Sequence, residues 1–97
     1  MPTYITLASY TDQGIRSVKD SPKRLDAAKK AIKAMGGELK AFYLTFGAYD
    51  FVTIAEAPND EVVAKFVLAT GSAGNVRTTT LKAFTEEEFR KIVAGLP

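Results

Sequence analysis

Residues 44–57 read LTFGAYDFVTIAEA, an apolar run that breaks at Gly47 and Asp50 and then resumes. Glycine supplies the positive φ that a tight turn needs, and aspartate hydrogen-bonds to neighbouring backbone groups, so these two positions have turn chemistry. We therefore predict a β-hairpin, with one strand over Leu39–Phe46 and the next over Tyr49–Ala57.

Both predicted strands carry apolar or aromatic side chains on both of their faces. The alternating sets are Phe42, Leu44 and Phe46 against Leu39, Ala41 and Tyr43 in the first strand, and Phe51, Thr53 and Ala55 against Val52 and Ile54 in the second. Because successive side chains point to opposite faces, neither side of this hairpin is suited to water. We expect helices to cover one face and a second copy of the chain to cover the other.

The segment before the hairpin predicts one strand and one long helix. Tyr4–Tyr10 is rich in β-branched and aromatic residues that alternate between two faces, which favours a strand. The Ser21-Pro22 pair is typical of a helix N-cap and first helical residue. Apolar residues then recur every three or four positions, so we predict an amphipathic helix over Pro22–Met35 that ends at Gly36-Gly37.

The segment after the hairpin predicts a second helix and a fourth strand. Asn59 is a typical N-cap residue, and the acidic residues that follow it favour the positive end of a helix dipole. The glycines of the segment Gly71–Gly74 end this helix. The strand is predicted over Asn75–Phe84.

The last segment has the clearest local signature in the chain. Thr85 and Glu88 have the spacing of a capping box, and Phe84 and Phe89 have that of a hydrophobic staple. We therefore predict a final helix whose buried side is formed by Phe89, Ile92, Val93 and Leu96.

The predicted order is β, α, β, β, α, β and a terminal helix. One four-stranded antiparallel sheet with helices on one face satisfies this order, which is the ferredoxin-like βαββαβ arrangement of the α+β class. A length of 97 residues, 46% of them apolar, allows a single domain over residues 1–97 with a modest core. Association with another copy would add to that core, so we expect a homodimer or a higher homo-oligomer.

Cysteine and histidine are both missing from the chain. Without cysteine there are no disulfides and no thiolate chemistry, and without histidine the commonest general base and metal ligand is absent. We therefore expect no metal and no cofactor.

Charge and hydropathy limit the remaining partners and the location. The net charge of +2 is too small to argue for a nucleic-acid partner, and the lysines of the predicted helix 22–35 favour a solvated face over a phosphate-binding strip. No leader pattern and no apolar run of about 18 residues occurs. We expect a cytoplasmic protein with no membrane partner.

Several short motifs resemble the GYD-domain family. They are Thr11-Asp12-Gln13-Gly14, Ser21-Pro22-Lys23-Arg24, Gly47-Ala48-Tyr49-Asp50 with Phe51 and Val52, and Gly74-Asn75-Val76-Arg77-Thr78. The resemblance spans nearly the whole chain and implies a ferredoxin-like fold of the dimeric α/β-barrel kind, but no activity. Relatives of that wider fold include cofactor-independent oxygenases, haem-degrading enzymes, isomerases and subunits without chemistry, and fold analogy does not choose among them.

No constellation of catalytic residues stands out, so the candidate residues are assigned to ligand binding. Tyr49 and Asp50 could form the rim of a pocket, with Asp50 as a weak general base or an acceptor; alternatively, Asp50 bonds the turn backbone and Tyr49 packs at a strand start. Arg77 could bind a carboxylate or phosphate, with a hydroxyl from Thr79 on the same face. Alternatively, Arg77 pairs with Asp50 or Glu56.

Three tyrosine and threonine positions complete the candidate set. Tyr4 and Thr6 alternate onto one face of the first strand, and Tyr43 lies on one face of the second. These side chains could line the same cavity, and buried tyrosines at a subunit interface explain them equally well.

Three functions stay open at this point. The first is a cytoplasmic homo-oligomer that binds a small organic or anionic molecule between sheet and helices without chemistry. The second is a cofactor-independent oxygenase or isomerase that uses Tyr49, Asp50 and Arg77. The third is a structural or regulatory subunit whose partner is another protein.

Overall fold

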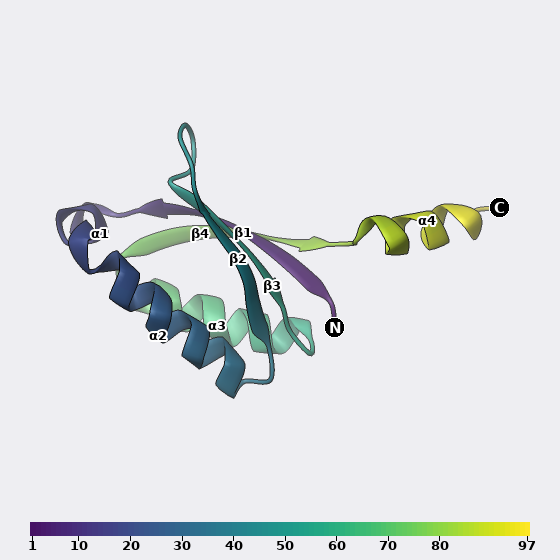
Figure 1. Ribbon diagram of the computed structural model, residues 1–97, viewed down its shortest axis with the longest axis horizontal. Coiled ribbons are helices and arrows are strands. Elements are labelled where there is room, and N and C mark those ends of the chain that lie inside the picture. Colours follow the sequence, from purple (N-terminus) through teal and green to yellow (C-terminus); the bar gives the residue numbers. More distant parts are fainter.

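The computed structural model describes all of residues 1–97 and contains one sheet, four α-helices and one short 3₁₀ turn (Figure 1). In chain order the elements are β1 (Thr3–Tyr10), α1 (Asp12–Arg16), η1 (Val18–Asp20), α2 (Ser21–Ala34), β2 (Glu38–Leu44), β3 (Phe51–Glu56), α3 (Asp60–Ser72), β4 (Val76–Ala83) and α4 (Glu86–Ala94). None of these helices combines the length and the apolar character that a bilayer crossing requires.

The four strands form one antiparallel sheet in the order β2-β3-β1-β4. The central strand β1 pairs on both sides, so that Ile5 lies opposite Ile54 of β3 and Leu81 of β4. Helices α2 and α3 lie side by side on one face of the sheet (Figure 1). The predicted ferredoxin-like α+β arrangement is therefore confirmed.

The face of the sheet that carries no helix is mainly apolar. Its side chains alternate with those that point toward α2 and α3. Thr3, Ser9, Glu56, Arg77 and Thr79 lie on this side, and its apolar residues are Ile5, Leu7, Ala41, Tyr43, Val52, Ile54, Leu81 and Ala83. We call these eight residues the open face. Two-sided apolar strands thus occur where the alternation predicted them, and one of the two sides has no cover within the chain.

A bulge in β2 corrects one detail of that alternation. The register of β2 against β3 shifts between Leu39 and Ala41. Leu39 therefore lies on the helix side with Phe42 and Leu44, whereas simple alternation predicted it on the side of Ala41 and Tyr43. The cause is the extra residue of a bulge, which puts the alternation out of phase.

The predicted hairpin is present, but its connection is longer than a tight turn. β2 ends at Leu44 and β3 begins at Phe51, so the strands are shorter than Leu39–Phe46 and Tyr49–Ala57 at the turn. Residues 45–50 form a loop that projects from the sheet (Figure 1) and contains Gly47 at φ 100°. Hydrogen bonds within the loop hold it in place of further pairing between the strands. The Thr45 N–H donates to the Asp50 carbonyl at 2.9 Å, and the Thr45 hydroxyl donates to the Tyr49 carbonyl at 2.7 Å.

The predicted helix starts hold in two cases out of three. Asn59 caps α3, with its Oδ1 accepting from Val62 N–H at 3.0 Å. In α2, however, Asp20 occupies the N-cap position, and Ser21 is already helical at φ −54° and ψ −42°. The 3₁₀ turn η1 runs directly into α2, so helical backbone starts before the Ser21-Pro22 pair.

Helix α4 has the predicted cap but not the predicted burial. Thr85 and Glu88 exchange both bonds of the capping box. The helix nevertheless projects away from the sheet (Figure 1), and its apolar side is exposed: Phe89 58%, Ile92 48%, Val93 47% and Leu96 65%. The prediction of a buried side is wrong for a single chain, because no other element of the chain lies against this helix.

The core that remains is small. Only six of the 97 residues are buried, and the four hydrophobic ones are Tyr4, Ala8, Ile32 and Ala57. Much of the apolar surface is instead divided among the open face, the exposed side of α4 and a cavity between sheet and helices.

Candidate functional site

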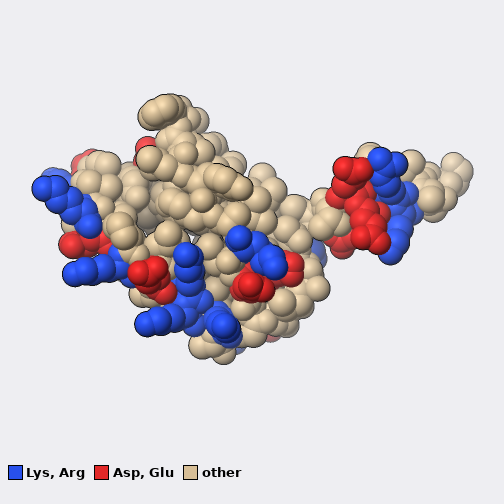
Figure 2. Space-filling model, in the orientation of Figure 1, with Lys and Arg blue, Asp and Glu red and all other residues tan.

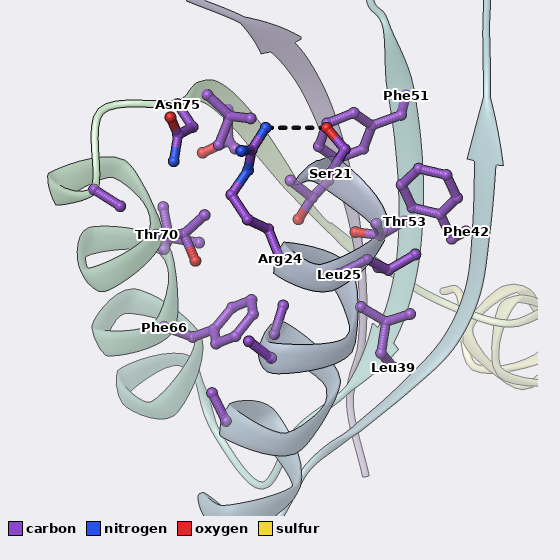
Figure 3. Close-up of a pocket in the computed structure, with 18 of the residues that line it drawn as sticks. Ser21, Arg24, Leu25, Leu39, Phe42, Phe51, Thr53, Phe66, Thr70 and Asn75 are labelled. Atoms are coloured by element: carbon purple, nitrogen blue, oxygen red, sulfur yellow. Dashed lines mark hydrogen bonds between the residues drawn. The ribbon is translucent and has the colours of Figure 1, made fainter. Parts of the chain in front are cut away.

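A cavity of about 670 Å³ lies between the sheet and the two helices that cover it (Figure 3). Its sheet side includes Thr6 and Tyr10 of β1 and Thr53 of β3, and its helix side includes Leu25 of α2 and Phe66 of α3. The volume falls within the range of about 300–1,000 Å³ that is typical of pockets for small organic molecules.

Aromatic rings from three neighbouring strands lie together on the sheet side. The ring centroids of Phe42 and Phe51 are 5.1 Å apart, and those of Tyr10 and Phe51 are 5.5 Å apart. Phe66 projects from α3 across the cavity (Figure 3). These rings give the cavity flat apolar walls that suit a planar or aliphatic ligand.

Polar groups gather toward one end of the cavity, around Arg24 in the first turn of α2 (Figure 3). Arg24 Nη1 donates to the carbonyl and hydroxyl oxygens of Ser17 at 3.2 and 3.3 Å, and Nη2 donates to Ser21 Oγ at 3.0 Å. Arg24 takes part in none of the five ion pairs of the chain. All hydrogen-bond partners of its positively charged guanidinium are therefore neutral.

The same end of the cavity contains Asn75, which a short network holds in place. Asn75 Oδ1 accepts from Gln13 Nε2 at 3.0 Å, and its carbonyl oxygen accepts from Thr11 N–H at 3.1 Å. The Thr11 hydroxyl also donates to Gly74 O at 2.6 Å. Because the amide oxygen is already bonded, the amide nitrogen of Asn75 is the group available to a ligand.

Of the predicted residues, Thr6 lines the main cavity and Tyr4 lines a separate hollow of about 260 Å³. The Tyr4 hydroxyl donates to Asp60 in the first turn of α3, and Lys82 Nζ lies 3.2 Å from Asp60 Oδ1. The hydrogen bond to Asp60, together with burial, raises the pKa of Tyr4 to about 12, and the bonds from Tyr4 and Lys82 lower the pKa of Asp60. Tyr4 thus fastens the start of α3 to the sheet.

The Asp50 side chain bonds to the backbone of β1, and not to that of its own turn as the structural alternative expected. Its Oδ2 accepts from Tyr10 N–H at 2.8 Å, and its own N–H donates to Ala8 O at 2.8 Å. These bonds fasten the loop 45–50 to the end of β1. Neither Tyr49 nor Asp50 lies among the residues that line the main cavity.

The remaining predicted residues lie on the other side of the sheet. Arg77, Thr79 and Tyr43 pair in register with open-face positions or their neighbours, so the backbone of the sheet separates them from Thr6. The expectation that Tyr43 shares a cavity with Tyr4 and Thr6 is wrong within one chain. The alternative pairing of Arg77 with a carboxylate is also wrong, since Arg77 forms no ion pair.

Sequence reasoning did not single out Arg24 or Asn75, although both belong to motifs quoted above. Spacing did not single out Arg24, because Lys29 also lies four positions from an apolar residue of the helix, Leu25. No carboxylate cluster of the kind that holds a metal ion occurs anywhere in the structure.

The solved structures that share this fold include two with a bound small molecule. A feast or famine regulatory protein from M. tuberculosis, complexed with L-methionine, has a TM-score of 0.66 and 14% identity over 88% of this chain, which spans 51% of that protein. The 5-chloro-2-hydroxyhydroquinone dehydrochlorinase of Burkholderia phenoliruptrix, in complex with 2,5-dihydroxybenzoquinone, has a TM-score of 0.61 and 18% identity over 90% of this chain and 97% of its own. At these identities the similarity establishes the fold alone.

Sequence similarity is stronger to one characterised protein. The glutamine synthetase and cystathionine beta-lyase binding protein of Thermus thermophilus is 36% identical over 84 residues, which cover 86% of this chain and 88% of that protein. The family model of the GYD domain matches residues 4–93. The chain therefore belongs to the GYD domain family.

Proposed function

We propose that this protein binds a small organic molecule in the cavity between the sheet and helices α2 and α3, and that it performs no chemistry on it. The observation that carries the proposal is the cavity itself, with flat apolar walls and polar groups concentrated toward one end. Binding sites for small molecules have this construction, in which apolar walls supply affinity and a few polar groups fix orientation. The bound small molecules of the two structures with the same fold are compatible with this role.

The residues around the cavity argue against catalysis there. Tyr10 and Arg24 are its only titratable lining residues, so no carboxylate is available as a general base. The enzyme alternative assigned Tyr49, Asp50 and Arg77 to one site. Asp50 bonds to the backbone of β1 instead, and Arg77 lies on the opposite side of the sheet. A binding role therefore agrees better with the geometry than an oxygenase or isomerase role.

The proposal is tested by fluorescence titration with N-phenyl-1-naphthylamine, a neutral probe that brightens in apolar surroundings. Ala28→Phe fills the cavity from α2, and we expect it to weaken binding by at least about tenfold because it removes space the probe needs. Ala34→Phe is the matched control, since Ala34 is exposed on the same helix and outside the cavity. Equal affinity in both variants would refute the cavity as the site.

Native mass spectrometry of the freshly purified protein adds a second readout. A reproducible extra mass relative to the denatured protein would identify a bound cellular molecule by its formula weight. We expect this extra mass to disappear in Ala28→Phe and to persist in Ala34→Phe. An extra mass that persists in both variants would place the molecule elsewhere on the protein.

We also propose that the chain self-associates through its open face. The support is the apolar character of this face, which no helix of the chain covers. A small protein rarely leaves a patch of this kind in contact with water. Burying the open face of one copy against that of a second would extend the small core of each.

Sedimentation at micromolar protomer concentration tests this association. Ile54→Asp places a charge at the centre of the open face, beside Ile5 and Ala41 in the register, and we expect it to yield a monomer. Leu68→Asp introduces the same charge on the exposed side of α3 and should leave the association unchanged. A monomeric unmodified protein would refute the proposal.

A second candidate function is that of a regulatory subunit for other enzymes. The observation in its favour is the 36% identity to a protein named for binding glutamine synthetase and cystathionine beta-lyase. The exposed apolar side of α4 offers a surface for such a partner. Surface plasmon resonance with the two enzymes from the same organism tests it: saturable binding that Phe89→Asp abolishes would support this role, and no binding at micromolar concentrations would refute it for these enzymes.

A further inference from the structure

We infer that the molecule bound in the cavity is a singly charged organic anion, with a carboxylate-type oxyanion on a flat apolar body, and that Arg24 recognises its charge. This inference rests on the proposed function, because it names the class of ligand for the same cavity. It follows from the charge balance of the cavity, from the donors at its polar end and from the charge on α2.

The positive charge of the cavity has no negative partner within the chain. Arg24 is half-buried, and it is the only charged residue that lines the cavity. Its three hydrogen bonds all go to neutral oxygens of Ser17 and Ser21. A cation beside apolar walls is poorly compensated by neutral acceptors, and an anion would supply the missing partner. One guanidinium matches one negative charge, which favours a carboxylate over a doubly charged phosphate.

Several hydrogen-bond donors at the polar end of the cavity are free. A guanidinium has five donors, and three bonds leave at least two of them free for a ligand. The amide nitrogen of Asn75 is a further free donor, since Gln13 already occupies the amide oxygen. Hydroxyl groups of Thr70 and Thr78 also line the cavity. The free N–H donors at this end belong to Arg24 and Asn75, and an acceptor-only group such as a carboxylate satisfies them.

Helix α2, which forms one wall of the cavity, carries an excess of positive charge. This helix carries four lysines and one arginine against the single acid Asp26. Figure 2 shows basic side chains along this part of the molecule. A positive helix in the wall of the cavity raises the local concentration of anions. On the sheet side of the cavity, the rings of Phe42 and Phe51 provide the wall for the apolar body.

A matched pair of probes tests the inference. The compound 8-anilino-1-naphthalenesulfonate differs from N-phenyl-1-naphthylamine only by a singly charged sulfonate, which stands in for the carboxylate. Charge-assisted hydrogen bonds should make the anion bind about tenfold more tightly or better to the unmodified protein. In Arg24→Met we expect this preference to disappear while the affinity for the neutral probe stays within about threefold.

Two further variants distinguish the effect of the forked N–H donors of the Arg24 guanidinium from the effect of positive charge alone. Lys23→Met removes a neighbouring positive charge outside the cavity and should preserve the preference for the anion. Arg24→Lys keeps the charge and loses the fork, so it should retain part of the preference. If Arg24→Met does not fold, as judged by circular dichroism, Arg24→Lys carries the test, and an unchanged preference in it would overturn the role of the fork.

The outcomes distinguish this inference from the function on which it rests. If the neutral probe binds and Ala28→Phe abolishes its binding, but the anion is not preferred, the cavity is a binding site and the anion inference fails. If neither probe responds to Ala28→Phe, the proposed function itself fails. A competition experiment tests whether the ligand carries one negative charge or two. We expect 1-naphthoate to displace the sulfonate probe better than 1-naphthyl phosphate does, and the reverse order would refute a singly charged ligand.

Discussion

Gly14→Ala should lower the free energy of unfolding by more than an added methyl group does at any surface position. Gly14 is buried in α1, where its N–H donates to Thr11 Oγ1 at 3.0 Å. A Cβ at this position would lie 1.9 Å from the carbonyl oxygen of Asn75 and 2.8 Å from its carbonyl carbon. Both atoms belong to the backbone, so no side-chain rotation relieves the clash.

The cost follows from the displacement that the methyl group requires. Real Cβ atoms essentially never approach closer than 3.0 Å, so the backbone at Asn75 must move by at least 1.1 Å, the difference between 3.0 and 1.9 Å. Overpacking of this kind costs about 1–3 kcal/mol, and loss of the hydrogen bond from Thr11 to Asn75 adds about 1 kcal/mol. A total of about 3 kcal/mol corresponds to a fall in Tm of about 12–24 °C for a domain of this size.

Urea unfolding followed by circular dichroism, at one fixed protomer concentration, measures this difference. The matched control is Gly71→Ala in α3, where no heavy atom lies within 4 Å of the added methyl and φ is not positive. There the same substitution should raise the free energy of unfolding by about 0.5–1 kcal/mol, because alanine is the better helix former. A loss below about 0.5 kcal/mol in Gly14→Ala, or an equal loss in both variants, would refute the packing argument.

Three further predictions concern the hydrogen-bonded contacts. The pKa of Tyr4 is about 12 in the folded protein, compared with an ordinary value of 10.0. Its contribution to stability is therefore complete below pH 10 and is lost as the pH rises toward 12. Urea titrations at pH 9–12 should show this loss of stability in the unmodified protein, and Tyr4→Phe should not show it. Asp50→Ala should cost about 1–2 kcal/mol of unfolding free energy by leaving Tyr10 N–H unpaired, and Asp50→Asn, whose amide oxygen can still accept, should cost less. Thr85→Ala should lower the stability of α4 by about 1 kcal/mol, seen as faster amide exchange within the helix, and unchanged exchange would contradict the capping role.

The fold was predictable because local chemistry and alternation agree along most of the chain. Asn59 and Thr85 cap helices as their residue types require, and the two-sided apolar pattern of β3 matches its place beside β1 in the sheet. The bulge after Leu39 was not predictable, because the residues around it are acceptable on either face. The prediction of a buried side for α4 was wrong for a different reason. An amphipathic pattern shows that one face of a helix is apolar, but it does not show which molecule covers that face.

The candidate site was less predictable than the fold, because the cavity is defined by how two helices lie over a sheet. Turn chemistry made Asp50 a candidate, but its carboxylate accepts from Tyr10 N–H of β1, a residue 40 positions away in the sequence. Arg24 is one of five basic residues in α2, and sequence alone does not separate it from the exposed lysines. Arg24 differs from these lysines only in the folded protein, where it lines the cavity and lacks a carboxylate partner.

The cavity and the open face use opposite sides of the same two strands. Thr6 and Thr53 face the cavity, and their neighbours Leu7 and Val52 belong to the open face. A ligand in the cavity therefore does not occupy the surface proposed for self-association, and the two events are sterically compatible. Any coupling between them must pass through the single layer of backbone in β1 and β3, where a shift on one side moves residues on the other. The arrangement also explains why one chain buries so little, because the helices enclose a cavity on one side of these strands and no element of the chain covers the other.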